Sequence, residues 1–439
     1  MSAIYPSQPA KRRGLVLGLG ASGLSALAYL QRQGWRMRAT DDCAGRSGLA
    51  GKAWCSSDQA LSILDETRLL VVSPGVPLDS KLVQAARERG LEILGDIELF
   101  ARSVLAPVVA ITGTNGKSTV TRLVEAMARM GGRVTAAGGN LGTPALDLLD
   151  PSVELYVLEL SSFQLELTES LAPRAAVVLN ISPDHLDRHG TLDAYVRAKA
   201  RIYQRAETGI FNRDDVLAGA LGHAGAERIT FGLNVPPADT DYGLRGGKLC
   251  RGGQVLISAD EVPLAGRHNL SNVLAAWALA STVGIADADI ARAVREFKPL
   301  AHRLELVAER DGTRFYDDSK ATNVSAACSS LQGLDGPLVV IAGGQGKGQD
   351  FADFADLLAA RARAVVLVGV DATLIARALD GRVDVINAAD MGEAVNAAAR
   401  LAQPGDNVVL APACASLDMF TNYAARGEAF VRAVEALDE

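Results

Sequence analysis

Long apolar runs, closely spaced cysteines and a surplus of positive charge are all missing from this sequence of 439 residues. Because no apolar segment is long enough to span a bilayer, we expect no membrane contact and a soluble, cytoplasmic protein. The five cysteines form no Cys-x-x-Cys pair, so we expect neither a disulfide framework nor a cysteine zinc site. The formal net charge of −7, with Lys and Arg spread along the chain, argues against a protein that binds nucleic acid.

The N-terminus has one feature of a secretory signal. A basic triplet at 11–13 precedes an apolar stretch at 14–30, as in the first two regions of a signal peptide. Gly18, Gly20 and Gly23 interrupt this stretch, however, at a spacing typical of a strand, a tight turn and a helix. We therefore interpret the segment as the start of a folded domain.

Apolar runs of strand length alternate with Ala- and Leu-rich helical patterns in three stretches of the chain. The first stretch opens with the run at 15–17, the second with the run at 108–111, and the third with the run at 338–342. In the second stretch, the runs at 155–160 and 176–179 have the continuous apolar character of buried parallel strands. This alternation predicts mostly parallel, doubly wound sheets.

The chain is long enough for two or three domains, and the three stretches favour three. We predict an α/β protein with a Rossmann-like N-terminal domain at 1–95 and a Rossmann-like C-terminal domain at 301–439. Between them we predict a central P-loop ATPase-like domain with a parallel sheet at 96–300. Within it, the Gly-rich, polar segment 234–253 predicts hairpins or loops.

The sharpest local signal is a glycine-rich loop between the run at 108–111 and a helical pattern at 120–130. The loop reads Gly113-Thr114-Asn115-Gly116-Lys117-Ser118-Thr119. Exposed N–H groups at a helix N-terminus favour phosphate oxygens, Lys117 would neutralise phosphate charge, and the Ser118 hydroxyl could bind Mg²⁺. Ile111 stands where the common phosphate loop has its first glycine. Nucleotide binding alone does not separate a hydrolase, a kinase and a ligase.

Polar residues at the ends of later strands are candidates for metal binding and catalysis. Glu159 ends an apolar run and is well placed to bind Mg²⁺ beside the phosphate loop. His185 could bind a metal or a substrate, and with His189 it could form a zinc pair, although the sequence lacks the glutamate of an HExxH motif. Taken alone, Lys199 is most simply a solvated helix lysine, and Asn140 is a loop amide.

In their order and spacing, these residues resemble the Mur ligases of bacterial cell-wall synthesis over essentially the whole chain. The resemblance begins at 18–23 and is most specific at 112–119, 158–164 and 180–187. The C-terminal block at 412–426 is most similar to the glutamate-adding branch of the family.

The resemblance implies an ATP-dependent ligase that adds D-glutamate to UDP-N-acetylmuramoyl-L-alanine through an acyl phosphate, in peptidoglycan precursor synthesis. It further implies a monomer that uses ATP and Mg²⁺, with two ions expected. The catalytic residues would be Lys117, Glu159, His185 and Lys199, the last of them carbamylated. The metal ions would be held by Ser118, Glu159, His185 and Lys199.

The resemblance also assigns residues to three binding sites. For the UDP-substrate it implies Gly18, Leu19, Gly20, Ala21, Ser22, Asp41, Gly75, Asn140 and His185. For ATP it implies the whole loop 113–119 together with Asn269, Asn272, Arg303 and Asp318. For the amino acid it implies Lys320, Thr322, Lys347, Ser416, Leu417 and Tyr423.

Two departures from the family pattern concern binding residues. The family often has Asp-Thr-Arg after its second strand, whereas this chain has Asp41-Asp42-Cys43. Asp41 can still bind the uridine, but the contact usually made by the next two residues is left without an assigned residue. Tyr423 replaces a more usual phenylalanine and adds a hydroxyl near the amino-acid pocket.

Three other functions fit part of the sequence. An NAD-dependent dehydrogenase would use the glycine turn at 18–23 with Asp41 as the ribose-binding acid, but it leaves the phosphate loop unexplained. Another Mur ligase or a folate polyglutamate ligase would keep the chemistry and change the substrate. A nucleotide-gated switch without chemistry would leave Glu159, His185 and Lys199 without a role.

Overall fold

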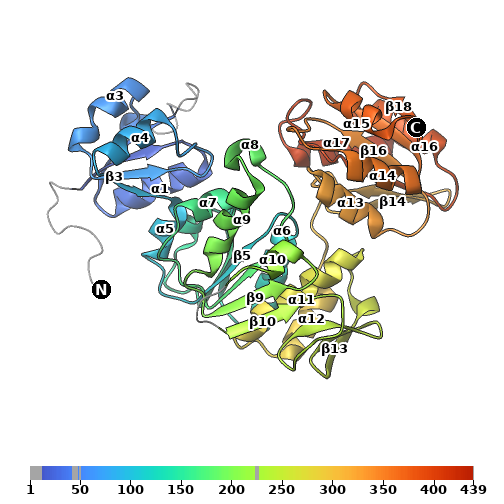
Figure 1. The fold of residues 1–439 in the computed structure, drawn as a ribbon, viewed down its shortest axis with the longest axis horizontal. Coiled ribbons are helices and arrows are strands. Elements are labelled where there is room, and N and C mark those ends of the chain that lie inside the picture. The colour runs from blue at the N-terminus through green and yellow to red at the C-terminus, as the bar shows by residue number, and fades with distance from the viewer. Residues whose placement is uncertain (1–11, 42–47, 49–50, 223–226, 439) are drawn as a thin grey trace. The chain divides into compact units, whose positions relative to one another are not determined.

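The computed structural model describes residues 12–41, 48, 51–222 and 227–438 of the chain (Figure 1). These residues form two compact units. Unit 1 contains the chain up to Ile181, together with Arg188–Ser258 and Asn272–Arg295. Unit 2 contains Ser182–Asp187, Ala259–Ser271 and the chain from Glu296 onwards. Two sheets belong to unit 1 and a third belongs to unit 2.

The first sheet of unit 1 has parallel strands in the order β2-β1-β3-β4. Its strands are β1 (Arg13–Leu17), β2 (Arg36–Thr40), β3 (Leu69–Val72) and β4 (Glu92–Leu94). Val16 packs into the core on one face, and Leu15 and Leu17 pack into the core on the other. Burial on both faces explains why these strands are continuous apolar runs.

The second sheet of unit 1 has the strand order β13-β12-β11-β10-β9-β8-β5-β7-β6. Its strands are β5 (Val108–Thr112), β6 (Thr135–Gly139), β7 (Leu155–Glu159), β8 (Ala175–Val178), β9 (Thr208–Asn212), β10 (Glu227–Phe231), β11 (Tyr242–Arg245), β12 (Lys248–Arg251) and β13 (Gln254–Ser258). The strands from β6 to β11 pair in parallel, whereas β11, β12 and β13 pair antiparallel. Strand β5 lies between β7 and β8, so the residues that follow these three strands meet at one edge.

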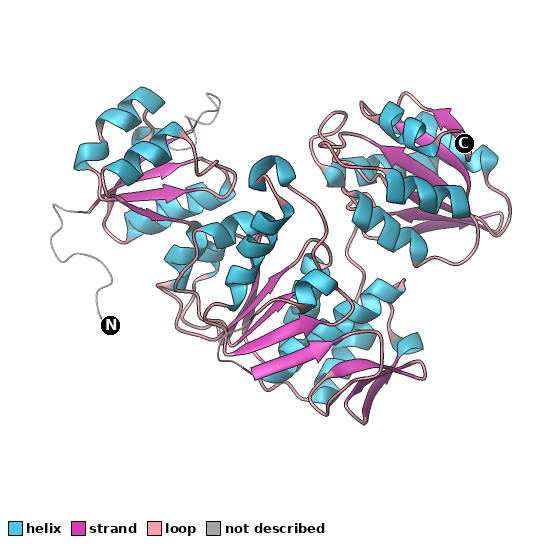
Figure 2. Cartoon of the chain, in the orientation of Figure 1, coloured by secondary structure: helices cyan, strands magenta, loops and turns pink. Residues whose placement is uncertain are grey.

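Helices pack against the sheets of unit 1 (Figure 2). They are α1 (Ala21–Arg32), α3 (Ser57–Ser62), α4 (Lys81–Glu88), α5 (Asp96–Ala101), α6 (Lys117–Met130), α7 (Ser162–Glu166), α9 (Leu192–Ala200), α10 (Val216–Gly219) and α12 (Asp287–Glu296). Two further helices, α8 (Leu186–His189) and α11 (Arg267–Thr282), contain residues of both units, and the last residue of α12, Glu296, also belongs to unit 2. Within the described ranges, no helix has both the length and the apolar character that crossing a membrane requires.

The sheet of unit 2 has the order β14-β15-β19-β16-β17-β18, and only β14 runs antiparallel to its neighbour. The strands are β14 (Glu305–Arg310), β15 (Thr313–Asp317), β16 (Leu338–Gly343), β17 (Ala362–Val368), β18 (Asp384–Asn387) and β19 (Asn407–Leu410). The helices are α13 (Val324–Gln332), α14 (Ala352–Arg361), α15 (Ala372–Leu379), α16 (Met391–Leu401) and α17 (Tyr423–Glu435). Val340 and Phe354 belong to the core on one face, and Ile341 and Phe430 belong to the core on the other.

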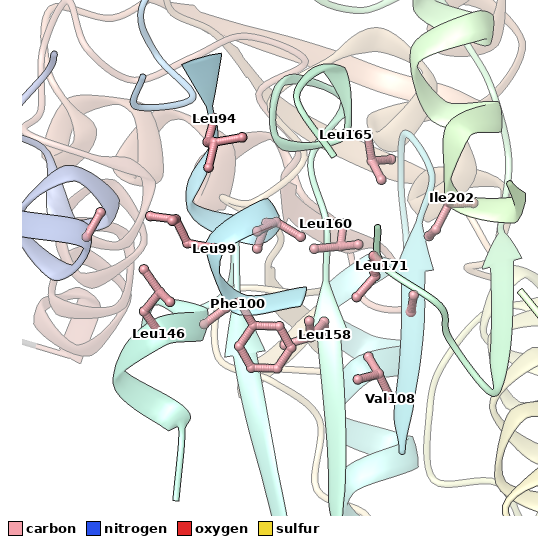
Figure 3. Packing of buried hydrophobic residues seen from close by; sticks show 14 of the residues in the cluster. Leu94, Leu99, Phe100, Val108, Leu146, Leu158, Leu160, Leu165, Leu171 and Ile202 are labelled. Atoms are coloured by element: carbon pink, nitrogen blue, oxygen red, sulfur yellow. The ribbon is translucent and has the colours of Figure 1, made fainter. Parts of the chain in front are cut away.

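One apolar core joins the two sheets of unit 1. Leu99 and Phe100 on α5 are buried in the same cluster as Leu158 on β7 and Leu30 on α1. The ring of Phe100 stacks edge-on against that of Tyr156, with 5.3 Å between the ring centroids. Figure 3 shows Phe100 beside Leu158 within this cluster. The shared core therefore ties the glycine turn at the start of α1 to the sheet that carries the phosphate loop.

The predicted fold class is confirmed, since all three sheets are mostly parallel and covered by helices. The runs at 15–17, 108–111 and 338–342 lie within β1, β5 and β16, and the segment 234–253 contains the hairpin of β11 and β12. The boundaries near residues 95 and 300 stay predictions, because contacts group the chain into two units.

Replacing Phe100 by alanine tests the shared core. The substitution removes a fully buried ring and its edge-on contact with Tyr156, so it should lower the free energy of unfolding by about 3–5 kcal/mol. Urea unfolding of the full chain measures the change. Leu105→Ala is the control, because Leu105 is 88% exposed and its loss should change stability by less than about 0.5 kcal/mol. Equal effects of the two variants would contradict the prediction.

Candidate active site

The phosphate loop fills the short gap between β5 and α6, and Asn180 holds it from the neighbouring strand. The Thr114 N–H donates to the Asn180 carbonyl at 2.9 Å, and the Asn115 N–H donates to Asn180 Oδ1 at 2.8 Å. The Asn180 amide in turn donates to the Asn115 carbonyl at 3.1 Å. Asn180 follows β8, which pairs with β5, so the strand order places Asn180 where it can bracket the loop with these three hydrogen bonds. Hydrogen bonds within the chain therefore hold the shape of the loop.

Gly116, the last residue before α6, must be a glycine. Its φ of 83° lies in the left-handed region, and a Cβ there would lie 2.5 Å from Oδ1 of Asn272. Asn272, on α11, is one of the predicted ATP residues, so the fold brings it to the loop. Among the described residues, no side chain caps the N-terminus of α6, where Ser118 and Thr119 are buried. The first N–H groups of α6 are therefore suited to bind phosphate oxygens.

Two lysines converge on the loop. Nζ of Lys117 donates to the carbonyls of Gly113 at 3.0 Å and Thr114 at 2.8 Å. Nζ of Lys199 donates to the same Gly113 carbonyl at 2.8 Å and lies 4.5 Å from the centre of the Tyr195 ring. Lys199 is only 2% exposed, so its interpretation as a solvated helix lysine is wrong. The two ammonium groups concentrate positive charge where the sequence predicts phosphate.

Glu159, the last residue of β7, is buried and only half satisfied. Its Oε1 accepts a hydrogen bond of 2.7 Å from the Asn140 amide, and its carbonyl accepts the Asn140 N–H at 2.8 Å. Oε2 is buried without a hydrogen-bond partner. Burying an unsatisfied carboxylate oxygen is costly, and a divalent cation beside the loop would satisfy it. Glu159 therefore fits the role of a Mg²⁺ ligand, while the role of Asn140 in binding the UDP-substrate stays a prediction.

The glycine turn between β1 and α1 is closed by two polar side chains. The Leu19 N–H donates to Asp41 Oδ2 at 2.5 Å, and the Ser73 hydroxyl donates to the Gly18 carbonyl at 2.6 Å. Any side chain at Gly23 would collide with the Gly18 carbonyl, so α1 can start this close to β1 only with glycine there.

The other predicted residues of the glycine turn lie where a nucleotide could reach them. Gly20 is the N-cap of α1, and Ala21 and Ser22 begin the helix. Gly75 lies exposed in the turn after β3, the strand that pairs with β1. Asp42 and Cys43, which depart from the family pattern, lie outside the described residues.

The two histidines of the possible zinc pair have different surroundings. His189 Nε2 lies 2.9 Å from the Ser162 hydroxyl, its Nδ1 lies 3.5 Å from Glu166, and its ring stacks on Phe163. These contacts occupy both ring nitrogens of His189 and leave none for zinc. His185 has a φ of 54° and donates its N–H to its neighbour Asp184. Its predicted roles stay predictions.

In unit 2, the predicted ATP residues Arg303 and Asp318 lie at the carboxyl end of β15. The Leu304 N–H donates to Asp318 Oδ1 at 3.1 Å, and Oδ2 is buried without a partner. Burial raises the pKa of Asp318 to about 7, against hydrogen bonds and the positive charge of Arg303, which lower it. Asn269 uses its amide to hold the Ala265 carbonyl at 2.6 Å, so its predicted contact with ATP stays untested.

The predicted amino-acid residues gather at the same edge of the sheet of unit 2. Nζ of Lys320 lies 4.0 Å from the centre of the Tyr423 ring, and the Thr322 N–H donates to the Lys320 carbonyl. Lys347 is exposed after β16 with a φ of 53°. Ser416 is buried after β19, where Leu417 is exposed.

Two loops of this edge are bound to each other. Gln345 and Ala415 exchange two backbone hydrogen bonds of 2.9 Å, which join the loop of Lys347 to the loop of Ser416. The Gly346 N–H donates to Asp371 Oδ2 at 2.7 Å. Lys347 and Ser416 are therefore held as one group.

Reasoning from the sequence missed several residues that hold these sites. Asn180 was in a recognised motif, but nothing in the sequence indicates that it brackets Asn115. Tyr195 faces Lys199, and Asp371 holds the Lys347 loop, yet both look like ordinary surface residues in the sequence. Asn180 and Asp371 follow strand ends, which is a signal that could have found them, whereas Tyr195 lies within α9 and has no such signal.

A phosphate-loop sheet combined with two further doubly wound sheets is the architecture of an ATP-using α/β enzyme. Three family models match this chain: the Mur ligase MurD-like N-terminal domain at 12–95, the Mur ligase middle domain at 111–280, and the Mur ligase glutamate ligase domain at 302–414. The chain therefore belongs to the Mur ligase family.

Similar proteins include ligases that share one name and solved structures of lower sequence identity. A protein of Nitrosococcus oceani is 48% identical over 96% of each chain, and one of Methylobacillus flagellatus is 48% identical over 97% of each. Both are named UDP-N-acetylmuramoylalanine--D-glutamate ligase.

The solved structures share the fold. A pseudomurein peptide ligase type C of Methanothermus fervidus has a TM-score of 0.66 at 17% identity, covering 97% of this chain and 100% of that one. The UDP-N-acetylmuramate-alanine ligase of Thermotoga maritima has a TM-score of 0.63 at 18% identity, and the match covers 97% of this chain and 99% of that one.

Asp318→Asn should remove a pH dependence of stability. A carboxyl with a raised folded pKa stabilises the native state below its unfolded pKa, and this contribution is lost as the pH rises towards the folded pKa near 7. Native stability should therefore fall between pH 5 and pH 8 relative to the variant, by about 2 kcal/mol at roughly 1.4 kcal/mol per pKa unit.

Urea unfolding at the two pH values measures this difference. Asp356→Asn is the control, because the Asp356 side chain is 70% exposed. A native-minus-variant difference that is the same at both pH values would show that Asp318 keeps an ordinary pKa.

Proposed function

We propose that this chain joins D-glutamate to the carboxylate of UDP-N-acetylmuramoyl-L-alanine, at the expense of ATP, in peptidoglycan precursor synthesis. The observation that carries the proposal is the meeting of Lys117, Lys199 and the half-satisfied Glu159 at the phosphate loop. The relatives at 48% identity supply the substrate names. We also propose that the chain acts as a monomer in the cytoplasm.

The first step must bring two anions together, the substrate carboxylate and the γ-phosphate of ATP. A carboxylate oxygen attacks phosphorus, the bond from phosphorus to the bridging oxygen breaks, and ADP leaves with that electron pair. The loop 113–119 binds the phosphates through its N–H groups, and Lys117 neutralises their charge. Mg²⁺, when bound by Ser118 and Glu159, supplies further neutralisation and alignment of the phosphates.

The finer features of the metal site are part of the proposal. Carbamylation would convert Lys199 from a cation to an anion, and an anion beside Glu159 suits two Mg²⁺ ions better than a lysine does. His185 completes the set as a ligand or as a contact to the substrate. The burial of Lys199 beside the phosphate loop supports a chemical role, because burying an ammonium group is costly.

The second step forms the amide. The glutamate amine attacks the acyl carbon, a tetrahedral intermediate forms, and inorganic phosphate leaves as the carbonyl returns. Lys320, Lys347 and Ser416 would bind the carboxylates of glutamate, with Thr322, Leu417 and Tyr423 around it. The acyl phosphate is easily hydrolysed, so water must be excluded from the site until the glutamate amine attacks.

The UDP moiety of the substrate would bind at the glycine turn. Gly18, Leu19, Gly20, Ala21 and Ser22 would offer N–H groups at the start of α1, and Asp41 would face the uridine. Gly75 and Asn140 would extend this site. ATP would further use Asn269, Asn272, Arg303 and Asp318.

Phosphate release tests the proposed reaction. The full chain is given ATP, Mg²⁺ and UDP-N-acetylmuramoyl-L-alanine, with D-glutamate, L-glutamate or a diamino acid in separate reactions. Release with D-glutamate alone, and a product heavier by one glutamyl residue, is the expected result. Release with a different amino acid would change the substrate within the family. A protein that releases no phosphate but binds a nicotinamide cofactor would overturn the proposal in favour of a dehydrogenase.

Lys117→Ala should abolish turnover, with a fall in kcat of at least about a hundredfold, because the phosphate charge is then no longer neutralised. Phosphate release at saturating substrates gives kcat. Lys248→Ala is the matched control, because Lys248 is exposed on the β12 hairpin and should keep the native rate. A near-native rate for Lys117→Ala would remove the phosphate loop from the mechanism.

Lys347→Ala should mainly weaken the use of glutamate. Losing a charge-assisted contact to a carboxylate should raise the KM for D-glutamate by roughly ten- to a hundredfold, while the KM values for ATP and the UDP-substrate change little. Initial rates with each substrate varied in turn separate the three constants. An unchanged KM for glutamate would exclude Lys347 from the amino-acid site.

A further inference from the structure

A buried carboxyl group that the proposed mechanism does not use lies between the two sheets of unit 1. Asp96 is the first residue of α5 and is only 2% exposed. Its Oδ2 accepts a hydrogen bond of 3.1 Å from the side-chain amide of Gln164, and its Oδ1 is buried without a hydrogen-bond partner. Burial raises the pKa of Asp96, against hydrogen bonds that lower it, including the one from Gln164. An aspartate is an expensive choice for a position that serves packing alone.

The Gln164 side chain links Asp96 to the loop that follows Glu159. Oε1 of Gln164 accepts the Ser161 N–H at 3.0 Å, and the Ser161 hydroxyl accepts the Gln164 N–H at 3.1 Å. Ser161 follows Leu160, whose carbonyl accepts the Thr112 hydroxyl at 2.7 Å immediately before the phosphate loop. A short chain of hydrogen bonds and covalent bonds thus runs from Asp96 to both Glu159 and the start of the loop.

On its other side, Asp96 faces the glycine turn. The Ser22 hydroxyl, in the first turn of α1, lies close enough to lower the pKa of the Asp96 carboxyl, although it makes no hydrogen bond of good geometry to Oδ1. Asp96 and Gln164 also line a small pocket with Ser73, which closes the glycine turn, and with Arg188. Asp96 therefore lies between Ser73, which closes the predicted UDP-binding turn, and Gln164 on α7, which follows the predicted catalytic strand.

The carboxylate of Asp96 allows one orientation of the Gln164 amide. An ionised carboxylate only accepts hydrogen bonds, and the Gln164 amide presents its NH₂ group to Asp96, as this form of the carboxyl group requires. The amide oxygen then faces the Ser161 N–H, as observed. The reverse orientation would place an oxygen against the carboxylate and an NH₂ group against an N–H, so both contacts would be repulsive.

We propose that Asp96 is a positioning residue of this enzyme: by fixing the orientation of Gln164, it couples the nucleotide-binding turn to the segment that directly follows Glu159. The inference rests on the proposed ligase function. It assigns to Asp96 a role in turnover rather than in folding alone, although Asp96 touches no reacting atom.

Exchanging the donor and the acceptor tests this role. Gln164→Glu places two carboxyl groups against each other. We expect their repulsion to be worth at least one pKa unit, which corresponds to a factor of about ten, so kcat should fall by about tenfold or more. In the double variant Asp96→Asn with Gln164→Glu, the new amide donates to the new carboxylate, and the Ser161 N–H keeps its acceptor. We expect the double variant to recover kcat to within about threefold of Asp96→Asn alone.

Phosphate release by the full chain gives kcat and the KM for each substrate, and thermal unfolding gives Tm for the same preparations. Asp147→Asn is the control: Asp147 also joins α1 to the central sheet, through a hydrogen bond of 2.7 Å from Ser25, but it should leave kcat native. A double variant that recovers Tm without kcat, or single variants that lower Tm at native kcat, would overturn the positioning role. If the native protein releases no phosphate with D-glutamate, the proposed function fails instead, and the assay separates the two cases.

Discussion

The alignment of carboxyl ends in a parallel sheet is the constraint on which this site depends. Strands β8, β5 and β7 are neighbours, so Asn180, Gly113 and Glu159 are brought to one edge although the chain separates them widely. Each strand needs only to be apolar and to end in a polar residue. The order of the strands then assembles the loop, its bracket and the carboxylate without further specific contacts. Helix α6, which starts at the same edge, adds its N–H groups to this set.

Burial gives these groups their chemical character. Glu159, Lys199 and Asp96 are nearly inaccessible to water, and Glu159 and Asp96 each have one carboxyl oxygen without a hydrogen-bond partner. Such groups cost stability, which the apolar core around Leu158 and Phe100 offsets. In return, they need little reorganisation when a charged ligand arrives, because the surrounding dipoles are already fixed. These polar groups lower stability but are preorganised for a charged ligand, which explains why they lie next to a dense apolar core.

Local patterns in the sequence predict the strands, the glycine loop and the position of Glu159, because these depend on residues near one another in the chain. The burial of Lys199 could not be predicted, since the sequence of α9 has basic residues on several faces and does not show which face packs. The contact of Asp96 with Gln164 spans 68 residues, and the bracket of Asn180 on Asn115 spans 65. Such pairs follow from strand order, which a single sequence does not reveal.

In unit 2 the carboxyl ends of parallel strands also define the predicted site, but the backbone of the connecting loops has a larger part in shaping it. Its predicted ligand residues lie at the carboxyl end of a mostly parallel sheet, but Lys347 takes a left-handed backbone conformation with a φ of 53°. Two neighbours of predicted residues do the same: His302, next to Arg303, has a φ of 62°, and Ala413, in the segment before Ser416, has a φ of 56°. Each such residue costs on the order of 1 kcal/mol or more, so the surrounding contacts must hold it in place. The exchange between Gln345 and Ala415 and the bond from Gly346 to Asp371 do so for Lys347. These contacts fix the backbone at Lys347 and with it the direction in which the side chain leaves the loop, which a binding group needs and packing alone does not.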